Sequence, residues 1–197
     1  MSACLLLLCC ATGQATESAQ PSLQAQAQSH AQLKVESFHT TLLAVLRLPQ
    51  QSAREALLQP QIQTLFDTRS IARISLGRTW RTLDTAQQQA FEGLLAELIV
   101  ATYASRFDGF NNQRFVTNGV EGVKSGFVVR TRLLRNSGDS VSLDYFLRDG
   151  KVFNVVANGV SDLSLRRADY NSIIKNEGYA RLVTHIKTKI AEARTPV

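Results

Sequence analysis

The chain has 197 residues, and its 22 Lys and Arg outnumber its 16 Asp and Glu, which gives a formal net charge of +6. This length suits one domain with its own core and excludes two full-sized domains. The positive residues are dispersed along the chain, which fits ordinary surface charge, an acidic partner or anionic lipid headgroups.

The first fifteen residues have the pattern of an export signal. Cys4 to Ala11 form an apolar run followed by small residues, like the core and cleavage region of a secretory signal. We expect cleavage near Ala11 or Ala15 rather than lipid attachment to Cys9 or Cys10, since neither cysteine follows a small residue. No later apolar run approaches the roughly 20 residues that cross a bilayer. These features predict a soluble protein exported to the periplasm.

The domain is expected to begin after a second N-terminal segment. Residues 16–32 are rich in Gln, Ala and Ser and lack apolar periodicity, which predicts a disordered leader. A single domain then spans residues 33–192. Its first helix is predicted over 33–48, where apolar residues recur at three- and four-residue steps, and Pro49 ends it.

Two shorter helices are predicted next. One covers residues 53–58 and stops before Pro60, because proline disfavours helical geometry in the residue that precedes it. The other runs from about 62 to 76 and ends at Gly77.

The longest predicted helix begins with a capping signal. Asp84 or Thr85 can accept backbone N–H groups of the first turn, and Gln87 or Gln88 can reach back to the cap. The apolar side of this helix extends to Phe107 at helical spacing.

After Gly109, the spacing of apolar residues changes from the helical pattern to the alternation of a strand. Strands are predicted over 127–134, 141–147 and 152–157, with a further edge strand near 115–120. The intervening turns are rich in Asn, Asp and Gly, which tolerate positive φ. Odd-numbered strand positions are mainly apolar and even-numbered ones polar, so one sheet face should be buried.

The chain returns to helical spacing over residues 169–174 and 180–190. Helices, then an antiparallel meander, then helices indicate an α+β fold with helices packed on one side of a sheet.

A search for catalytic chemistry gives little. His30, His39 and His185 are solitary, without a second ligand at metal-binding spacing, and no phosphate loop, dinucleotide motif or nucleophile elbow occurs. Asp144 could act as a general base only if the strand register slipped by one residue. We therefore expect a protein that is not an enzyme and has no catalytic residues, metal or cofactor. The alternatives are an isomerase or hydrolase with a cone-shaped pocket, and a structural or interaction protein with a filled core.

Arginines cluster before the longest helix, without the exposed aromatic residues of a nucleic-acid-binding surface, so no nucleic-acid partner is expected. Arg69 and Arg73 lie one helical turn apart and Arg81 follows. They form either salt bridges with nearby carboxylates or a cationic rim for a lipid headgroup or an acidic partner. Trp80 is either a core residue or part of a ligand wall.

The stretch FDTRSIARISLGRTWRTLDTAQQQAF, residues 66–91, resembles a conserved block of the MlaC or toluene-tolerance family, the periplasmic lipid-binding component of the Mla system that maintains outer-membrane lipid asymmetry. Residues 149–186, DGKVFNVVANGVSDLSLRRADYNSIIKNEGYARLVTHI, continue the resemblance. ATYASRFDGF at 101–110 and SDLSLRRADY at 161–170 resemble the hopanoid-associated branch, HpnM. The family usually has an aromatic residue and an aspartate where Val152 and Asn154 stand here.

This resemblance implies a twisted antiparallel sheet of about four strands covered by several helices, with an apolar cavity between them. It also implies a monomeric carrier of phospholipid or hopanoid. Its partners would be an inner-membrane transporter of the ABC or RND type, for which it is an auxiliary component, and an outer-membrane lipoprotein complex.

On this expectation, the lipid tails contact the apolar sheet face and the long helical stripe. The predicted wall residues are Leu76, Trp80, Leu95, Ile99, Tyr103, Phe107, Val129, Leu133, Leu143, Tyr145, Phe153 and Val155. The residues predicted to meet a headgroup or partner are Arg69, Arg73 and Arg81.

Overall fold

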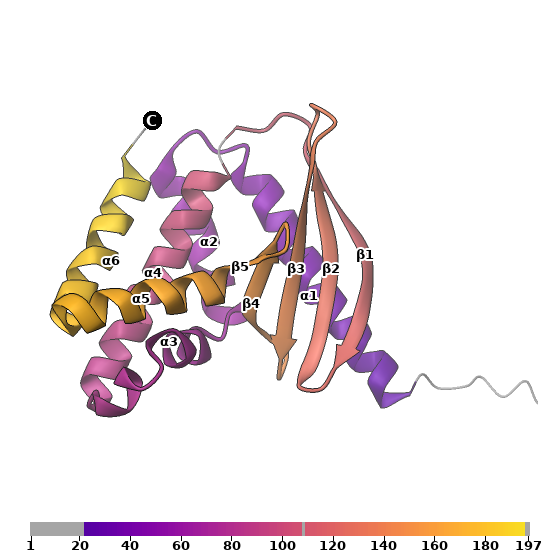
Figure 1. Cartoon of the computed structure of the whole chain (residues 1–197). Coiled ribbons are helices and arrows are strands. Elements are labelled where there is room, and N and C mark those ends of the chain that lie inside the picture. The colour runs from indigo at the N-terminus through magenta and orange to yellow at the C-terminus, as the bar shows by residue number, and fades with distance from the viewer. Residues whose placement is uncertain (1–21, 108, 196–197) are drawn as a thin grey trace, which may run out of the picture.

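The computed structural model of the protein describes residues 22–107 and 109–195, so the predicted signal and the start of the predicted leader lie outside the described residues. The described chain forms helices packed around one antiparallel sheet, the predicted α+β class (Figure 1). The helices are α1 (Leu23–Val45), α2 (Gln51–Leu65), α3 (Thr68–Leu76), the 3-10 helix η1 (Thr79–Thr82), α4 (Thr85–Arg106), α5 (Asp162–Glu177) and α6 (Tyr179–Arg194). The strands are β1 (Arg114–Val123), β2 (Gly126–Leu134), β3 (Ser140–Arg148), β4 (Lys151–Ala157) and β5 (Val160–Ser161).

Helix α1 begins ten residues before the predicted start of the domain. The prediction of a disordered leader is therefore wrong for residues 23–32. Ser22 caps the helix by accepting a hydrogen bond from the backbone N–H of Ala25 at 3.2 Å. Ala and Gln have high helix propensity, so this segment needs few apolar contacts to extend the helix, and Ala31 alone is buried in it.

The boundary between the two shorter helices also differs from the prediction. Helix α2 continues through Pro60 and ends at Leu65, because the proline is exposed and buried Leu58 and Ile62 hold the helix on either side of it. Phe66 then adopts extended geometry and pairs with Val152 in an isolated parallel bridge. Asp67 starts α3 as its N-cap, accepting from the N–H of Ser70 at 2.9 Å.

The predicted capping signal of the longest helix is confirmed. Asp84 accepts a hydrogen bond from the backbone N–H of Gln87 at 2.8 Å, and the Gln87 side chain accepts one from the N–H of Asp84 at 3.0 Å. This reciprocal pair fixes the start of α4, and with it the direction in which the helix presents its apolar side to the sheet.

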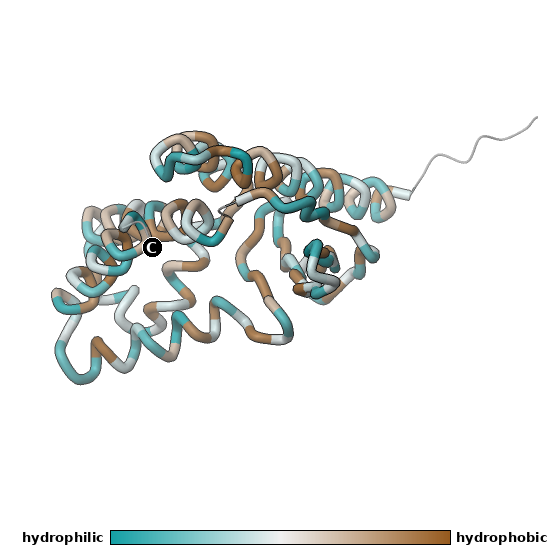
Figure 2. Tube along the Cα trace, turned by 90° about the horizontal axis from the view of Figure 1, so that it is seen from above, coloured by the Kyte–Doolittle hydropathy of each residue, from teal (hydrophilic) through white to brown (hydrophobic). Residues whose placement is uncertain are grey.

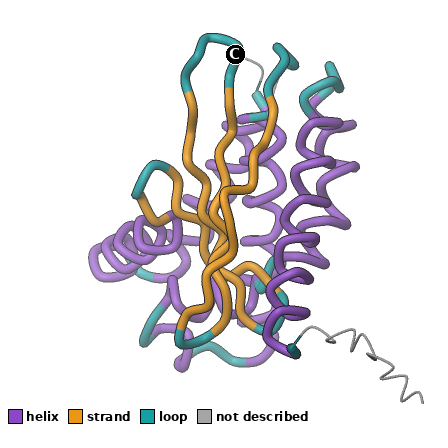
Figure 3. The backbone as a smooth tube through the Cα atoms, turned by 90° about the vertical axis from the view of Figure 1, so that its right-hand side faces the viewer, coloured by secondary structure: helices purple, strands orange, loops and turns teal. Residues whose placement is uncertain are grey.

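The sheet is a meander in which β1 to β5 follow one another as neighbours. The three predicted central strands are confirmed, and the predicted edge strand is present as β1, which is longer than expected. The β3–β4 hairpin turns at Asp149 and Gly150, which have φ of 50° and 71°, as a tight two-residue turn requires. Figure 3 shows the strong twist of the strands.

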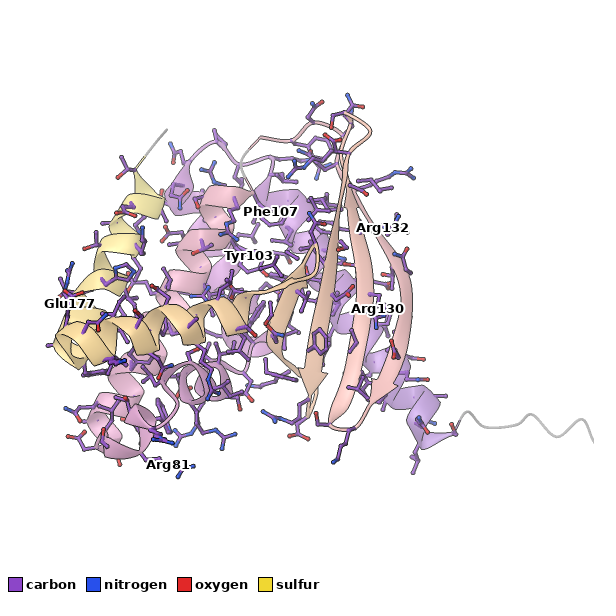
Figure 4. The ribbon with its side chains drawn as sticks, in the orientation of Figure 1. Arg81, Tyr103, Phe107, Arg130, Arg132 and Glu177 are labelled. Carbon is purple, nitrogen blue, oxygen red and sulfur yellow. The ribbon has the colours of Figure 1, made fainter. Side chains whose placement is uncertain are left out.

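The predicted alternation of faces is also observed. Val129, Thr131 and Tyr145 are buried on the face that packs against helices. Arg130 lies on the opposite face and forms ion pairs with Glu121 and Asp144, the latter at 2.8 Å (Figure 4). Asp144 therefore points away from the interior, as the predicted register requires.

The hydrophobic core extends from Ala31 on α1 to Ile190 on α6. Helix α1 packs along β1 and β2, whereas α5 contacts β4, and Figure 2 shows these two helices on opposite sides of the molecule. In the described part of the chain, no helix combines the length and apolarity that a membrane span would need.

Candidate functional site

A cavity of about 470 Å³ lies between α4 and the inner face of the sheet. Residues of α3 and α5 line its remaining sides, together with Phe66 after α2 and Leu46 after α1. The lining consists of Leu46, Phe66, Ile71, Ile99, Thr102, Tyr103, Arg106, Phe107, Gln113, Leu133, Arg135, Val141, Leu143, Phe153, Asn154, Val155, Ala157, Asp162, Leu163 and Arg166. Most of these side chains are apolar, and the polar ones come mainly from the ends of elements.

Seven of the predicted wall residues line this cavity. Ile99 and Tyr103 come from α4 and Phe107 is its C-cap residue, and steps of four residues place all three on one side of the helix. Leu133, Leu143, Phe153 and Val155 come from β2, β3 and β4. Helix and sheet thus form the two opposing walls, and Figure 4 shows Tyr103 and Phe107 near the upper end of α4.

The other five predicted wall residues are packed in the core and do not line the cavity: Leu76, Trp80, Leu95, Val129 and Tyr145. Leu95 lies one turn before Ile99, where α4 packs against α2 and α6. Tyr145 lies beneath α1, with its ring in edge contact with Phe38 at 6.4 Å. Sequence periodicity identified these residues as inward-facing. It does not distinguish inward-facing residues that pack against other side chains from those that line a cavity.

Several lining residues were not among the predicted wall residues. Phe66 and Ile71 bracket the start of α3, and Leu163 lies in the first turn of α5. Phe66 and Ile71 are distant in sequence from the sheet, whereas Leu163 follows β5 by two residues. Their apolar character was visible in the sequence, but their meeting at one end of the cavity depends on how α3 and α5 pack together.

The mouth of the cavity is defined here by the four lining residues that are exposed: Arg106, Arg135, Ala157 and Asp162. They lie at the end of α4, just after β2, at the end of β4 and at the start of α5. Arg106 and Arg135 have no carboxylate partner among the described residues. Within residues 22–107 and 109–195, the mouth therefore has two positive side chains without an ion-pair partner.

A third arginine at the cavity, Arg166, is compensated. Its Nε donates to Asp162 at 2.7 Å, and its Nη1 donates to the hydroxyl of Tyr170 at 3.4 Å. Burial acts to lower the pKa of the Arg166 guanidinium, but Asp162 and Tyr170 outweigh it, so the pKa is raised and the group stays charged. The Asp162–Arg166 pair thus contributes polarity without net charge.

Tyr103 is the central aromatic residue of the helical wall. Its ring lies 5.4 Å from that of Phe38, 6.0 Å from Phe66 and 5.8 Å from Phe107, measured between centroids. Burial raises the pKa of the Tyr103 hydroxyl, with the charge of Asp162 as a further cause, so the side chain is neutral throughout the physiological range.

The three arginines predicted to meet a headgroup do not line the cavity. Arg69 lies 3.8 Å from Glu92, and its guanidinium is 5.9 Å from the centre of the Trp80 ring. Arg73 and Arg81 are exposed, and Figure 4 places Arg81 at the lower end of the molecule, below Tyr103 and Phe107. The cations at the mouth come instead from the ends of a helix and a strand.

The lining offers few groups for catalysis. None of the lining residues is Ser, Cys or His, and the hydroxyl of Thr102 donates to the carbonyl of Leu98 at 2.7 Å. His39 is buried beside Tyr145, and His185 lies 3.6 Å from Asp169. Residues 22–107 and 109–195 contain no group of three or more His, Cys, Asp or Glu side chains that could hold a metal ion.

Comparisons with known proteins agree with this fold. A solved structure of a phospholipid-binding protein from Ralstonia solanacearum, in complex with a phospholipid, has the same fold, with a TM-score of 0.72 and 21% sequence identity. The match covers 86% of this chain and 99% of that one. No functionally curated protein matches the sequence significantly. The family model described as MlaC protein matches residues 36–188, most of the chain. The chain therefore belongs to the MlaC family.

Proposed function

We propose that this protein is a lipid carrier that encloses the apolar part of a phospholipid between α4 and the sheet. The observation that carries the proposal is the cavity of about 470 Å³ with apolar walls and a cationic mouth. Protein interiors are close-packed, with few voids larger than a water molecule, so a cavity of this size indicates a ligand site. The phospholipid in the Ralstonia solanacearum structure supports this class of cargo.

The energetics of transfer fit such a carrier. A lipid that leaves a bilayer exposes its chains to water, and each buried methylene recovers about 0.8 kcal/mol. A long chain placed in the cavity therefore offsets on the order of 10 kcal/mol of that cost. Binding of this strength protects the lipid in transit and still permits its release to a membrane complex that binds the chain equally well.

The remaining elements of the proposal come from family membership and from the sequence. The carrier would act in the periplasm, because residues 4–11 form a signal-like apolar run. As a monomer, it would move lipid between an inner-membrane transporter of the ABC or RND type and an outer-membrane lipoprotein complex. The resemblance to HpnM makes a hopanoid the alternative cargo.

The lining favours a carrier over an enzyme. A general base or nucleophile must be free to reach its substrate. Asp162 is the carboxylate in the lining, and it is held by Arg166 at 2.7 Å. Tyr103 is neutral because its pKa is raised by burial, and Thr102 is bonded to its own helix.

The test is to extract the purified protein with organic solvent and to analyse the extract by mass spectrometry, alongside native mass spectrometry of the intact complex. We expect one lipid per protein, and we expect the emptied protein to take up lipid from phospholipid vesicles and deliver it to acceptor vesicles. A protein that carries no lipid and takes none from vesicles would refute the proposal. Lipid uptake without delivery to acceptor vesicles would support lipid binding but refute the proposed transfer between membranes.

A further inference from the structure

The volume of the cavity limits what it can hold. In other proteins, a cavity of about 150 Å³ accommodates one benzene ring, which corresponds to roughly 25 Å³ per carbon atom. At that ratio, the 470 Å³ found here takes on the order of 18 carbon atoms. That is one long acyl chain, whereas a pair of such chains would need about twice the space.

Aromatic rings prevent the cavity from extending toward α1. Phe38 makes edge contacts with Phe66 at 5.6 Å and with Tyr103 at 5.4 Å, and Phe107 stacks on Phe115 at 6.2 Å. Phe115 in turn stacks on His39 at 3.9 Å. Together these rings form an aromatic partition between the cavity and the backbone of α1, the helix that carries Phe38 and His39. A second chain could enter on this side only if several mutually packed rings moved together, which is costly in a close-packed interior.

The side facing α6 is closed by core packing as well. Ile99 lines the cavity, but Leu95 one turn earlier and Phe91 beyond it are fully buried among α4, α5 and α6. The ring of Phe91 contacts those of Tyr170 and Tyr179 at 6.1 and 6.0 Å. The cavity is therefore a single chamber that opens at its mouth.

The mouth selects the charge of the cargo. Arg106 and Arg135 lack a carboxylate partner among the described residues, while Arg166 is compensated by Asp162. A lipid with its anionic group at the mouth would face two positive charges there. Its acyl chain would extend inward, past Tyr103 and Phe107.

Building on the proposed function, we propose that the cargo of this chain is an anionic lipid with a single acyl chain, a lysophospholipid in preference to a diacyl phospholipid or a pentacyclic hopanoid. A lysophospholipid and a free fatty acid share the chemistry that this site would recognise, which is one long chain bearing one anionic group. The aromatic partition of Phe38, Phe66, Tyr103, Phe107 and Phe115 acts as the size filter.

The experiment uses the full chain, freed of co-purified lipid, and measures binding to lysophosphatidylglycerol of increasing chain length. Affinity should rise by about fourfold per methylene and level off near 16 to 18 carbons, where the chamber is full. Diacyl phosphatidylglycerol with the same chains, offered in vesicles, should be taken up at least about tenfold more weakly, because its second chain would leave the bilayer for water. The free fatty acid of matched length shows whether phosphate or carboxylate is the preferred anion, and a preference for either supports a single-chain site.

A second measurement tests the filter itself. Phe107→Ala should enlarge the chamber and raise the affinity for the diacyl lipid relative to the monoacyl lipid, whereas Phe91→Ala, which removes an equally large buried ring away from the cavity, should leave that ratio unchanged. The wild-type chain-length series decides the question even if a variant fails to fold. Diacyl binding at least as tight as monoacyl binding, or a hopanoid in the native extract, would overturn this inference and leave the lipid carrier intact. Binding of none of these lipids would overturn both.

Discussion

Nε2 of His39 lies 3.2 Å from the hydroxyl of Tyr145, so a polar contact inside the core joins α1 to β3. The imidazole ring also stacks on Phe115, with an interplanar angle of 8°. This contact connects the helix to the sheet directly behind the aromatic partition. It also places a titratable group where water has little access.

The first prediction concerns the pH dependence of folding. Burial lowers the pKa of His39 from 6.5 to about 4, and nearby Glu36 opposes this only in part. The unfolded chain therefore binds a proton that the folded chain excludes between these values, and the free energy of unfolding should fall as the pH drops from about 6.5 to about 4. The loss amounts to at most about 3 kcal/mol.

Urea unfolding at a series of pH values measures this effect. His39→Gln keeps a side chain that can bond to Tyr145 but does not titrate, so it is the matched control. The difference in stability between the wild type and this variant should change across that window and become constant below it. If the free energies of unfolding of the wild type and the variant changed in parallel between pH 6.5 and about 4, the claim that His39 is buried and neutral would be contradicted.

The second prediction concerns the sheet wall of the cavity. Leu143→Glu places a carboxylate among the apolar side chains of the cavity, where an acyl chain would have to desolvate it. We expect lipid occupancy to drop at least about tenfold in native mass spectrometry. Leu165→Glu introduces the same charge at an exposed position outside the lining and should retain its lipid. Equal occupancy in the two variants would show that the lipid lies elsewhere.

The third prediction concerns the charge at the mouth. Arg106→Gln should weaken binding of an anionic lipid by a few-fold to about tenfold at low salt, and the difference from the wild type should shrink as salt rises, because the residue is exposed. Binding of a zwitterionic lipid with the same chain should change little. Arg132→Gln, on the outer face of β2 and away from the cavity, is the control. An equal loss in both variants would indicate a general charge effect rather than a contact at the mouth.

The fourth prediction concerns the β2–β3 pairing that builds the sheet wall. Gly126 has φ of +144°, and a Cβ on it would overlap the carbonyl oxygen of Leu147. Gly126→Ala should therefore lower the free energy of unfolding by more than about 1 kcal/mol. Gly138→Ala tests the same substitution at a positive φ where a Cβ would meet no atom within 4 Å, and it should cost less. Similar losses for both would show that backbone conformation, not the contact with Leu147, dominates.

The sequence predicted the sheet well because strand periodicity and turn chemistry are local properties. The alternation of apolar Val129 and Leu133 with Arg130 and Arg132 predicted which face is buried, and Asp149–Gly150 predicted the hairpin. The start of α4 was predicted for the same reason, since Asp84 and Gln87 cap the helix through their own neighbours.

Helix boundaries set by distant contacts were predicted less well. The break between α2 and α3 at Phe66 depends on pairing with Val152, and the backbone N–H of Asp67 donates to the carbonyl of Val152 at 2.8 Å. These residues are far apart in sequence. Pro60 was a local signal for an end that tertiary packing overrode, because buried residues on both sides keep the helix continuous.

By itself, the sequence determined the α+β class, the buried face of the sheet and the apolar side of α4, because each follows from the spacing of side chains along one element. Only the tertiary structure decided which inward-facing residues surround empty space and which are packed. Ile99 and Leu95 are both apolar and one turn apart, yet the first lines the cavity and the second lies in the core. That difference depends on the positions of α2, α6 and the aromatic partition, and no local pattern encodes them.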